Sequence, residues 1–360
     1  MDSKKYKIGI IGLGPVGLVL AAHMQEAGCE VHICDVEKKK INLIRSEGIE
    51  LSGKVKRSTF FKHVYSSLNE LLEQEIDILI SAVKAYHVDS VLAQIKEQVS
   101  GNLFLLSAQN GIDVREKYTS HFEESQILRM VVNYAGNLHS PNVVNVTFFN
   151  PPNYIASVDD SRTDIAEWLS ETLTSANLET LCKDSFVIAD KIWEKTILNA
   201  ALSPLCAISK LTMKEAMDHP DTLEIIEQII FEAIEVAKAE EIKLGDNFVK
   251  LCIRYLKNAG NHFPSLAVDL IGGKETEIDY MNGKIVEYGR KHYIRTPLNL
   301  TFTNLVKAIS HKNCNSKKIL ILYFKLFKLI LLWIRLSWST VRIICEIIST
   351  CNTCYFKISA

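Results

Sequence analysis

The chain has 360 residues, enough for two domains, and its 48% hydrophobic and 23% charged residues are ordinary for a globular protein. A formal net charge of −1 excludes the strongly basic surface that nucleic acid needs, so we expect no nucleic-acid partner. The nine cysteines show no disulfide framework, and the N-terminus runs straight into a predicted strand without room for a targeting peptide, so we expect a cytoplasmic protein.

The order of the predicted elements indicates two kinds of architecture. Apolar runs at 7–12, 30–35, 76–83, 102–108 and 128–133 alternate with helical patterns, which predicts a parallel sheet built from βαβ units. A β-rich stretch follows around Pro151 and Pro152, and from about Asp164 the pattern is helical, notably at 184–209, 221–241 and 247–259. We expect an α/β protein with an N-terminal Rossmann-type, mostly parallel sheet domain over 1–180. An all-α C-terminal domain follows over 181–314, and then a tail over 315–360.

The first predicted strand leads into a glycine-rich turn of the form GxGxxG, followed by a helix. This context predicts a dinucleotide site, because the glycines permit the turn, the approach of a pyrophosphate and close helix–strand packing. Proline suits the first turn of the helix, whose N-terminus favours phosphate. A turn needed only for packing is the alternative. The expected cofactor-binding residues of the turn are Gly12, Leu13, Gly14, Pro15, Val16 and Gly17.

Asp35 lies at the tip of the second predicted strand. A carboxylate there accepts hydrogen bonds from ribose hydroxyls and repels a 2′-phosphate, so the sequence favours NAD over NADP. The lysines at 38–40 would counter this preference if they reached a phosphate, but a solvated helix start is the expected role for them.

The stretch WEKTILNAALSP at 193–204 places Lys195, Asn199 and Ser203 four residues apart, so on a helix they share one face. A solvated face ending in a cap would have the same spacing. Such a face usually carries further charges, and none follows until Lys210. The spacing therefore indicates a lysine above a ladder of small hydrogen-bonding groups.

Other polar residues follow predicted strands or lie in one later region. Lys84 and the Gln-Asn-Gly turn at 109–111 come at the carboxyl ends of strands, where open α/β sheets bind ligands. Glu277 and Asp279 are two residues apart in a helical, partly apolar region, so at most one of them points inward.

These segments together resemble the ketopantoate reductase (2-dehydropantoate 2-reductase) family of the 6-phosphogluconate dehydrogenase-like superfamily. The matching pieces are GLGPVG, AVKAY, QNG, WEKTILNAALSPL and PSLAVDLIGGKETEIDYMNG, in the family's order from residue 7 to about 310. The resemblance implies an active site in the cleft between a Rossmann domain and a helical domain. It also implies NADP or NAD as cofactor, a small 2-oxo acid as substrate, a role in pantothenate biosynthesis and a homodimer as one oligomeric form.

The resemblance also implies roles for individual residues. Lys195, Asn199 and Glu277 match the catalytic lysine, the asparagine one turn later and the acidic partner. Lys84 and Asn110 match residues that border the cofactor and the substrate. The implied substrate-binding residues are Asn110, Lys195, Asn199, Ser203, Asn261 and Ser265.

The implied chemistry is hydride transfer to the C2 carbonyl of a 2-oxo acid. An ammonium stabilises the charge that develops on the carbonyl oxygen and donates a proton, provided that burial lowers its pKa toward about 7–8. Glu277 would orient this ammonium, and the cofactor carries the difficult step.

Three departures from the family pattern keep alternatives open. Ser203 stands where the family usually has a second asparagine. Asp35-Val36 stands where NADP-using members often continue into an arginine. Either Asn261 or His262 occupies the position of an expected asparagine contact. A related hydroxyacid or opine-type dehydrogenase, and a non-catalytic nicotinamide-nucleotide sensor, are therefore the alternative functions.

The tail differs in composition from the rest of the chain. Charges interrupt the apolar run at 317–348 every few residues, which disfavours a membrane-spanning helix. On a helix, five of these charges would share an arc of about 100°, which favours peripheral contact with an anionic membrane or a partner. An altered reading frame is the alternative. Cys351 and Cys354 cannot close a zinc site alone, and we expect no metal site. The five charges are Lys325, Lys328, Arg335, Arg342 and Glu346.

Overall fold

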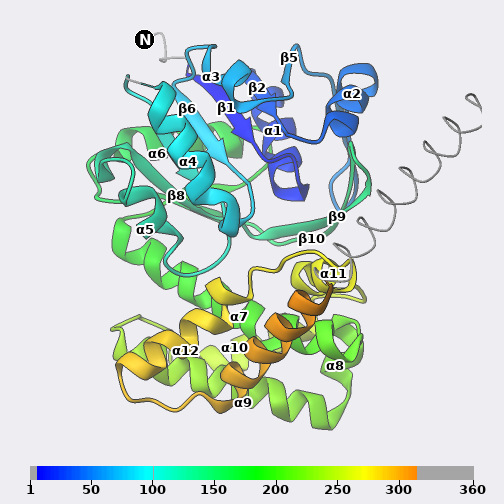
Figure 1. Cartoon of the computed structure of the whole chain (residues 1–360). Helices are drawn as coiled ribbons and strands as arrows, with labels where there is room; N and C mark the ends of the chain where they lie inside the picture. Colours follow the sequence, from blue (N-terminus) through cyan, green and yellow to red (C-terminus); the bar gives the residue numbers. More distant parts are fainter. Residues whose placement is uncertain (1–5, 100, 314–360) are drawn as a thin grey trace, which may run out of the picture. The chain divides into compact units, whose positions relative to one another are not determined.

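The computed structural model describes residues 6–99 and 101–313, and the residues up to Lys307 form one compact unit. An eight-stranded sheet with strand order β12-β11-β8-β7-β6-β1-β2-β5 forms the upper part of this unit in Figure 1. The helices that follow the sheet region in the chain form the lower part. The predicted fold class, a Rossmann-type, mostly parallel sheet followed by a helical region, is confirmed. The domain boundaries expected at 180 and 314 stay a prediction.

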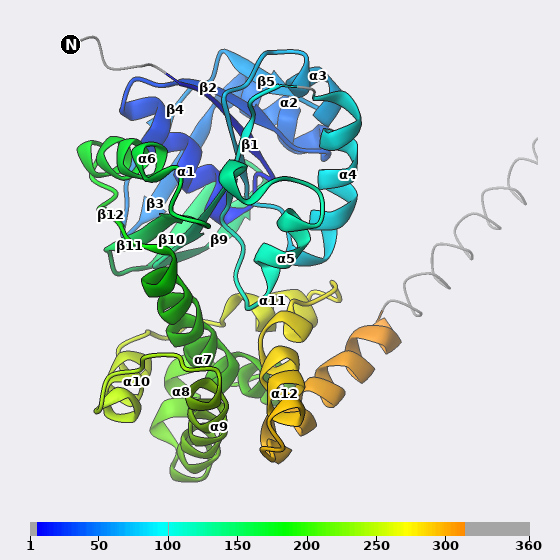
Figure 2. The ribbon, with the colours of Figure 1, turned by 90° about the vertical axis from the view of Figure 1, so that its left-hand side faces the viewer.

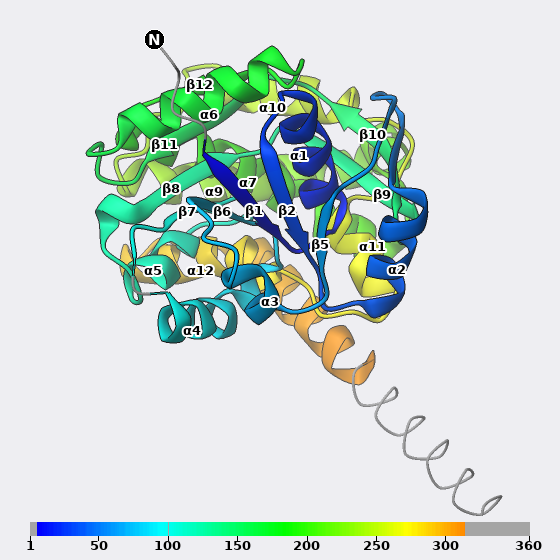
Figure 3. The same cartoon turned by 90° about the horizontal axis from the view of Figure 1, so that it is seen from above.

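The centre of the large sheet is parallel because its strands are joined by helical crossovers. Seen from above in Figure 3, these strands fan out side by side. Their inner residues are nearly all buried, which explains why each appears in the sequence as a continuous apolar run. All five predicted strands are confirmed, as β1 (Lys7–Ile11), β2 (Glu30–Cys34), β6 (Ile78–Ser81), β7 (Phe104–Ser107) and β8 (Ile127–Val131).

The β-rich stretch predicted around Pro151 and Pro152 is confirmed, since it contains β10 (Val143–Phe149) and β11 (Asn153–Ser157), whereas the remaining short strands fall outside the sequence prediction. Strand β11 runs antiparallel to β8, and β12 (Thr180–Cys182) extends that edge within a region that we expected to be helical. At the other edge lies β5 (His63–Tyr65). A second, four-stranded sheet consists of β3 (Ile49–Gly53), β4 (Arg57–Thr59), β9 (Tyr134–Ser140) and β10.

The helices of the sheet region cover its two faces and bury their apolar sides on it. They are α1 (Pro15–Glu26), α2 (Lys38–Glu47), α3 (Leu68–Leu72), α4 (Val88–Gln98), α5 (Val114–Thr119) and α6 (Thr163–Ser175).

The predicted helices of the second region are confirmed. Figure 2 shows α7 (Ser185–Ser209) running from the sheet region into the helical region. Asp184 caps its N-terminus, since the carboxylate accepts a hydrogen bond from the Val187 amide at 2.8 Å. The other helices are α8 (Met213–Asp218), α9 (Pro220–Ala239), α10 (Phe248–Lys257), α11 (Ser265–Ile271), the 3-10 turn η3 (Ile278–Tyr280), α12 (Asn282–Lys291) and a last helix that begins at residue 297 and is described up to 313.

A proline inside α7 explains one buried contact between these helices. Pro204 has no amide hydrogen, so the carbonyl of Ala200 four residues earlier loses its helical partner. The buried Asn282 side chain donates to this carbonyl at 3.0 Å and also to Asn299 at 3.0 Å. Asn282 therefore replaces the missing helical hydrogen bond of Ala200 and connects α12 to α7.

Within the described residues, none of the helices combines the length and the apolar character that crossing a bilayer requires. The membrane contact expected for 317–348 lies outside the described residues.

Candidate functional site

The glycine-rich turn has the geometry that its sequence predicts. Gly12 has a φ of +84°, and a Cβ there would lie 2.6 Å from the Val83 amide nitrogen. A Cβ on Gly17 would lie 2.1 Å from the Gly12 carbonyl oxygen, so only glycine lets α1 begin this close to β1. A Cβ on Gly14 would meet nothing within 4 Å, which leaves open space above the turn. The cradle therefore fits a dinucleotide pyrophosphate at the N-terminus of α1.

Asp35 is already engaged within the chain. Its carboxylate accepts hydrogen bonds from the Leu13 amide at 2.8 Å, from the Glu37 amide at 2.9 Å and from the Lys40 ammonium at 2.9 Å. Lys40 is 6% exposed, so the expectation that all three lysines at 38–40 belong to a solvated helix start is wrong for this one. A neutralised carboxylate repels a phosphate less than a bare one, which weakens the electrostatic argument for NAD.

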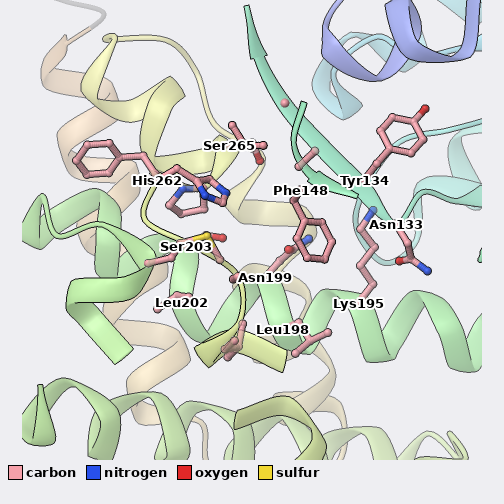
Figure 4. A pocket seen from close by; sticks show the side chains of 18 of the residues that line it. Asn133, Tyr134, Phe148, Lys195, Leu198, Asn199, Leu202, Ser203, His262 and Ser265 are labelled. Atoms are coloured by element: carbon pink, nitrogen blue, oxygen red, sulfur yellow. The ribbon is translucent and has the colours of Figure 1, made fainter. Parts of the chain in front are cut away.

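A pocket with an empty volume of about 770 Å³, its open mouth included, lies between the two regions. One face of α7 forms its floor, β9 and β10 form one wall, and the loop before α11 forms the opposite wall (Figure 4). Lys195, Asn199 and Ser203 all line it, as their spacing on one helix face predicts. Ser265 lines it from the start of α11.

Lys195 is a partly buried cation that forms no ion pair within residues 6–99 and 101–313. Its ammonium donates a hydrogen bond to the main-chain carbonyl of Val132, directly after β8. Burial, helped by the positive charge of Arg129 and opposed by the negative charge of Glu277, lowers the pKa of Lys195 to about 7. An amine with this pKa exchanges a proton readily near neutral pH.

Four other polar side chains of the pocket have hydrogen-bonding groups to offer to a ligand. The side chains of Asn199, Ser203, Ser265 and His262 form no hydrogen bond with any described residue, although all four line the pocket. Burial lowers the pKa of His262, so its imidazole is neutral near pH 7. Of the two residues left open for the expected asparagine contact, His262 lines the pocket wall, whereas Asn261 is exposed and does not line the pocket; substrate binding by Asn261 stays a prediction.

A second cluster of charges joins the sheet to the helical region. Lys84 follows β6 and donates to Asp269 of α11 at 2.7 Å and to Glu277 at 3.3 Å. Glu277 also accepts from the Ala85 amide at 3.0 Å. The expected role of Glu277 in orienting the Lys195 ammonium therefore stays a prediction, since no hydrogen bond joins these two side chains within the described residues. Glu277 acts on Lys195 only through space, and its hydrogen-bonding partner is Lys84. Of the two acidic residues near η3, Glu277 is buried and Asp279 is exposed, as the sequence predicts.

The Gln-Asn-Gly turn rests on a buried polar network that sequence reasoning missed. Arg129 of β8 is 3% exposed and donates to the Ser107 hydroxyl at 2.8 Å and to the Gly111 carbonyl at 3.1 Å. Gln109 donates to the carbonyl and hydroxyl of Ser81, both at 2.9 Å. Asn110 lies on top of this network, half-buried, and its side chain forms no hydrogen bond with any described residue. An arginine inside the apolar run ILRMVV is the signal that could have revealed the network.

Glu30, His32 and His63 lie together on β2 and β5 and carry groups that could ligate a metal. The two imidazoles stack at 4.1 Å with an interplanar angle of 7°, so their in-plane lone pairs run parallel and do not converge. His32 bonds to Glu30 at 3.0 Å and to the Tyr65 hydroxyl at 3.0 Å. These contacts account for the cluster without a ligand.

Comparisons with known proteins agree with this geometry. The family model described as "Ketopantoate reductase PanE/ApbA" matches residues 8–159, and the one described as "Ketopantoate reductase PanE/ApbA C terminal" matches residues 187–310. The 2-dehydropantoate 2-reductase of Aquifex aeolicus is 28% identical over 84% of this chain and 96% of its own length.

Solved structures share the fold. A PanE/ApbA family ketopantoate reductase from Ralstonia eutropha is 27% identical with a TM-score of 0.76, over 85% of this chain and 99% of that one. A D-mandelate dehydrogenase solved with NADH and anilino(oxo)acetate is 24% identical with a TM-score of 0.75, over the same shares of the two chains. The chain belongs to the ketopantoate reductase family and is an NAD(P)-dependent oxidoreductase.

Proposed function

From this family membership and the contents of the pocket, we propose that the protein reduces 2-dehydropantoate (ketopantoate) to pantoate, a step of pantothenate biosynthesis. The observation that carries the proposal is a lysine with a pKa of about 7 beside unpartnered amide, hydroxyl and imidazole groups in one pocket. A nicotinamide cofactor supplies the hydride when bound, and the glycine-rich cradle of Gly12, Gly14 and Gly17 would hold its pyrophosphate.

In this proposal Lys195 is the general acid. Its ammonium holds the proton that passes to the substrate's carbonyl oxygen as charge develops there, and it compensates that charge meanwhile. Asn199 and Ser203 offer neutral hydrogen bonds to the hydroxyl and carbonyl of the substrate. Ser265 and the neutral His262 lie on the opposite wall, where they can bind the carboxylate. Asn110 would contact substrate or cofactor at the end of β7.

Glu277 and Lys84 support the site in another way. Their ion pair, together with Asp269, links the end of β6 to the helical region. We propose that this link holds the cofactor-binding edge of the sheet in place relative to the pocket floor on α7. The hydride can then reach the carbon, and the proton the oxygen, of the same carbonyl group. Lys84 would also border the nicotinamide.

For the cofactor we propose a preference for NADH that is smaller than Asp35 alone would give. The carboxylate at the tip of β2 opposes a 2′-phosphate, but Lys40 neutralises part of its charge. The D-mandelate dehydrogenase of the same fold carries NADH in its solved structure.

Steady-state kinetics with ketopantoate and either NADH or NADPH test the proposal. We expect turnover with both, and a higher kcat/KM with NADH. A panel of other 2-oxo acids tests the second candidate, a related hydroxyacid or opine-type dehydrogenase. Two features favour keeping it, the short Ser203 in the pocket floor and the D-mandelate dehydrogenase fold. Faster reduction of another acid would remove ketopantoate as the substrate. If the protein binds the cofactor but reduces none of the acids, the remaining alternative is a non-catalytic nicotinamide-nucleotide sensor.

We expect the substrate to be a small molecule, and light scattering of the purified chain tests the expected homodimer.

A further inference from the structure

Arg129 is a buried cation with no carboxylate bound to it. Its guanidinium is 3% exposed, and among the described residues its hydrogen bonds go only to the Ser107 carbonyl and hydroxyl and to the Gly111 carbonyl. Taking an unpaired charge out of water is unfavourable, and hydrogen bonds to neutral acceptors offset only part of that penalty. A leucine or methionine would fill the strand interior without this penalty, so packing alone does not explain the arginine.

The guanidinium and the Lys195 ammonium bond to residues at the same edge of the sheet, the C-terminal ends of β7 and β8. Arg129 belongs to β8, and Lys195 donates its hydrogen bond to Val132, the first residue after β8. The two cations repel each other, which contributes to the low pKa of Lys195. The charge of Arg129 cannot swing away, because its two terminal nitrogens are tied to the end of β7 and to the Gln-Asn-Gly turn.

We propose that Arg129 is a positioning residue that acts through Lys195, because its fixed positive charge makes the Lys195 ammonium a better proton donor to the substrate. This inference rests on the proposed function only in the last step, the use of that proton. The charge coupling itself is inferred from the position of both cations at the C-terminal ends of β7 and β8 together with the lowered pKa of Lys195, and it does not require turnover.

Other groups around Lys195 act on its charge less directly. Glu277, before η3, is the negative group that faces it, and Glu277 is already paired with Lys84. Asp269 of α11 is paired with Lys84 as well. The remaining titratable groups that line the pocket are neutral near pH 7, namely Tyr134 of β9, Tyr255 of α10 and His262.

The test compares three substitutions that separate charge from shape. Arg129→Met removes the charge and the donors, Arg129→Gln removes the charge and keeps donors, and Arg129→Lys keeps the charge. Two readouts follow the protonation of Lys195. One is the pH profile of kcat, measured with the 2-oxo acid that the parent enzyme reduces fastest. The other is the pH dependence of labelling at residue 195 by an amine-reactive reagent, quantified by mass spectrometry without any turnover.

We expect the Met and Gln variants to move the midpoint of both profiles upward by at least about one pH unit, which leaves roughly tenfold more ammonium at pH 9. The Lys variant should stay near the parent profile. A purely structural role would lower kcat or thermal stability at every pH without moving either midpoint. If the Met and Gln midpoints coincide with the parent's, or if Lys moves as far as Gln, the inference is overturned.

The two readouts keep this inference separate from the proposed function. If no 2-oxo acid is reduced, the proposed function fails, and the labelling profile still decides the coupling of Arg129 to Lys195. If Arg129→Met does not fold, the Gln and Lys variants carry the comparison, since both retain donors for Ser107 and Gly111.

Discussion

The low pKa of Lys195 implies that this lysine destabilises the folded protein. In the unfolded chain its pKa is near the ordinary 10.5, and in the folded protein burial brings it to about 7. The folded state therefore binds the proton less well than the unfolded state. Replacing Lys195 with methionine, which has a similar length and no charge, should stabilise the fold while it removes the proton donor.

The size of this effect follows from the shift. A displacement from 10.5 to about 7 is worth at most about 5 kcal/mol below pH 7, at about 1.4 kcal/mol per pH unit. The ammonium borders an open pocket, which reduces the penalty, and the variant loses the hydrogen bond to Val132, which costs about 1 kcal/mol. We expect a net gain of about 2 kcal/mol in the free energy of unfolding at pH 6.5. For a chain of 360 residues the gain corresponds to a rise in Tm of roughly 2–3 °C.

The lowered pKa also fixes how the free energy of unfolding changes with pH. Between pH 7 and pH 10.5 the unfolded chain holds more protons on Lys195 than the folded one, so parent stability rises with pH in this window. The advantage of Lys195→Met should therefore be largest below pH 7 and shrink toward pH 10. Thermal unfolding at several pH values measures it. The matched control is Lys191→Met, one turn earlier on α7, where the lysine pairs with Glu194 at 2.8 Å. An advantage that is absent, or that stays constant with pH, would refute the reasoning. The variant should also lose at least about 100-fold in kcat.

Three further predictions concern the surroundings of Lys195 and the cofactor edge. Glu277→Gln should lower kcat/KM at least about 10-fold, because it breaks the buried ion pair with Lys84. The control is Glu275→Gln, at an exposed position, and equal kinetics in the two variants would contradict the supporting role of Glu277. Asp35→Asn should lower the ratio of kcat/KM with NADH to kcat/KM with NADPH, whereas Lys40→Met, which leaves the Asp35 carboxylate without its cation, should raise that ratio. If both variants shift the ratio in the same direction, the charge at the tip of β2 does not set the cofactor preference. His262→Ala should raise the KM for the 2-oxo acid about 3–10-fold through the loss of one hydrogen bond, and Asn261→Ala should not; the opposite result would return Asn261 to the site.

The parts of the fold that the sequence predicted are those with a strong local pattern. The five central strands are buried on both faces and therefore appear as apolar runs, and α7 carries a cap at Asp184 and a long apolar face. The three-residue strands β4, β5 and β12 are too short to show a period, and each forms only because a neighbouring strand offers its edge. Pairing between strands far apart in the chain, such as β3 with β10, leaves no local pattern in either segment.

The site was predictable where one element carries it. Lys195, Asn199 and Ser203 share a face of α7, and the helical period alone brings them into one pocket. The contacts between different elements could not be predicted from the sequence. The choice of His262 over Asn261 depends on how the loop before α11 turns. The bond from Arg129 to Gly111 depends on the position of β8 beside β7.

The two lysines of the site show why a residue type cannot indicate its own chemistry. Burial lowers the pKa of both amines, but the Lys84 ammonium touches the carboxylates of Asp269 and Glu277, which outweigh burial and raise its pKa above the ordinary value. Among the described residues the Lys195 ammonium hydrogen-bonds only to a carbonyl oxygen, and burial together with the charge of Arg129 lowers its pKa to about 7. Lys84 therefore stays an ammonium at every working pH and suits binding and electrostatic support. Lys195 can give up its proton to a developing alkoxide and regain it from water near neutral pH. If the two lysines were exchanged between these environments, their roles would be exchanged too.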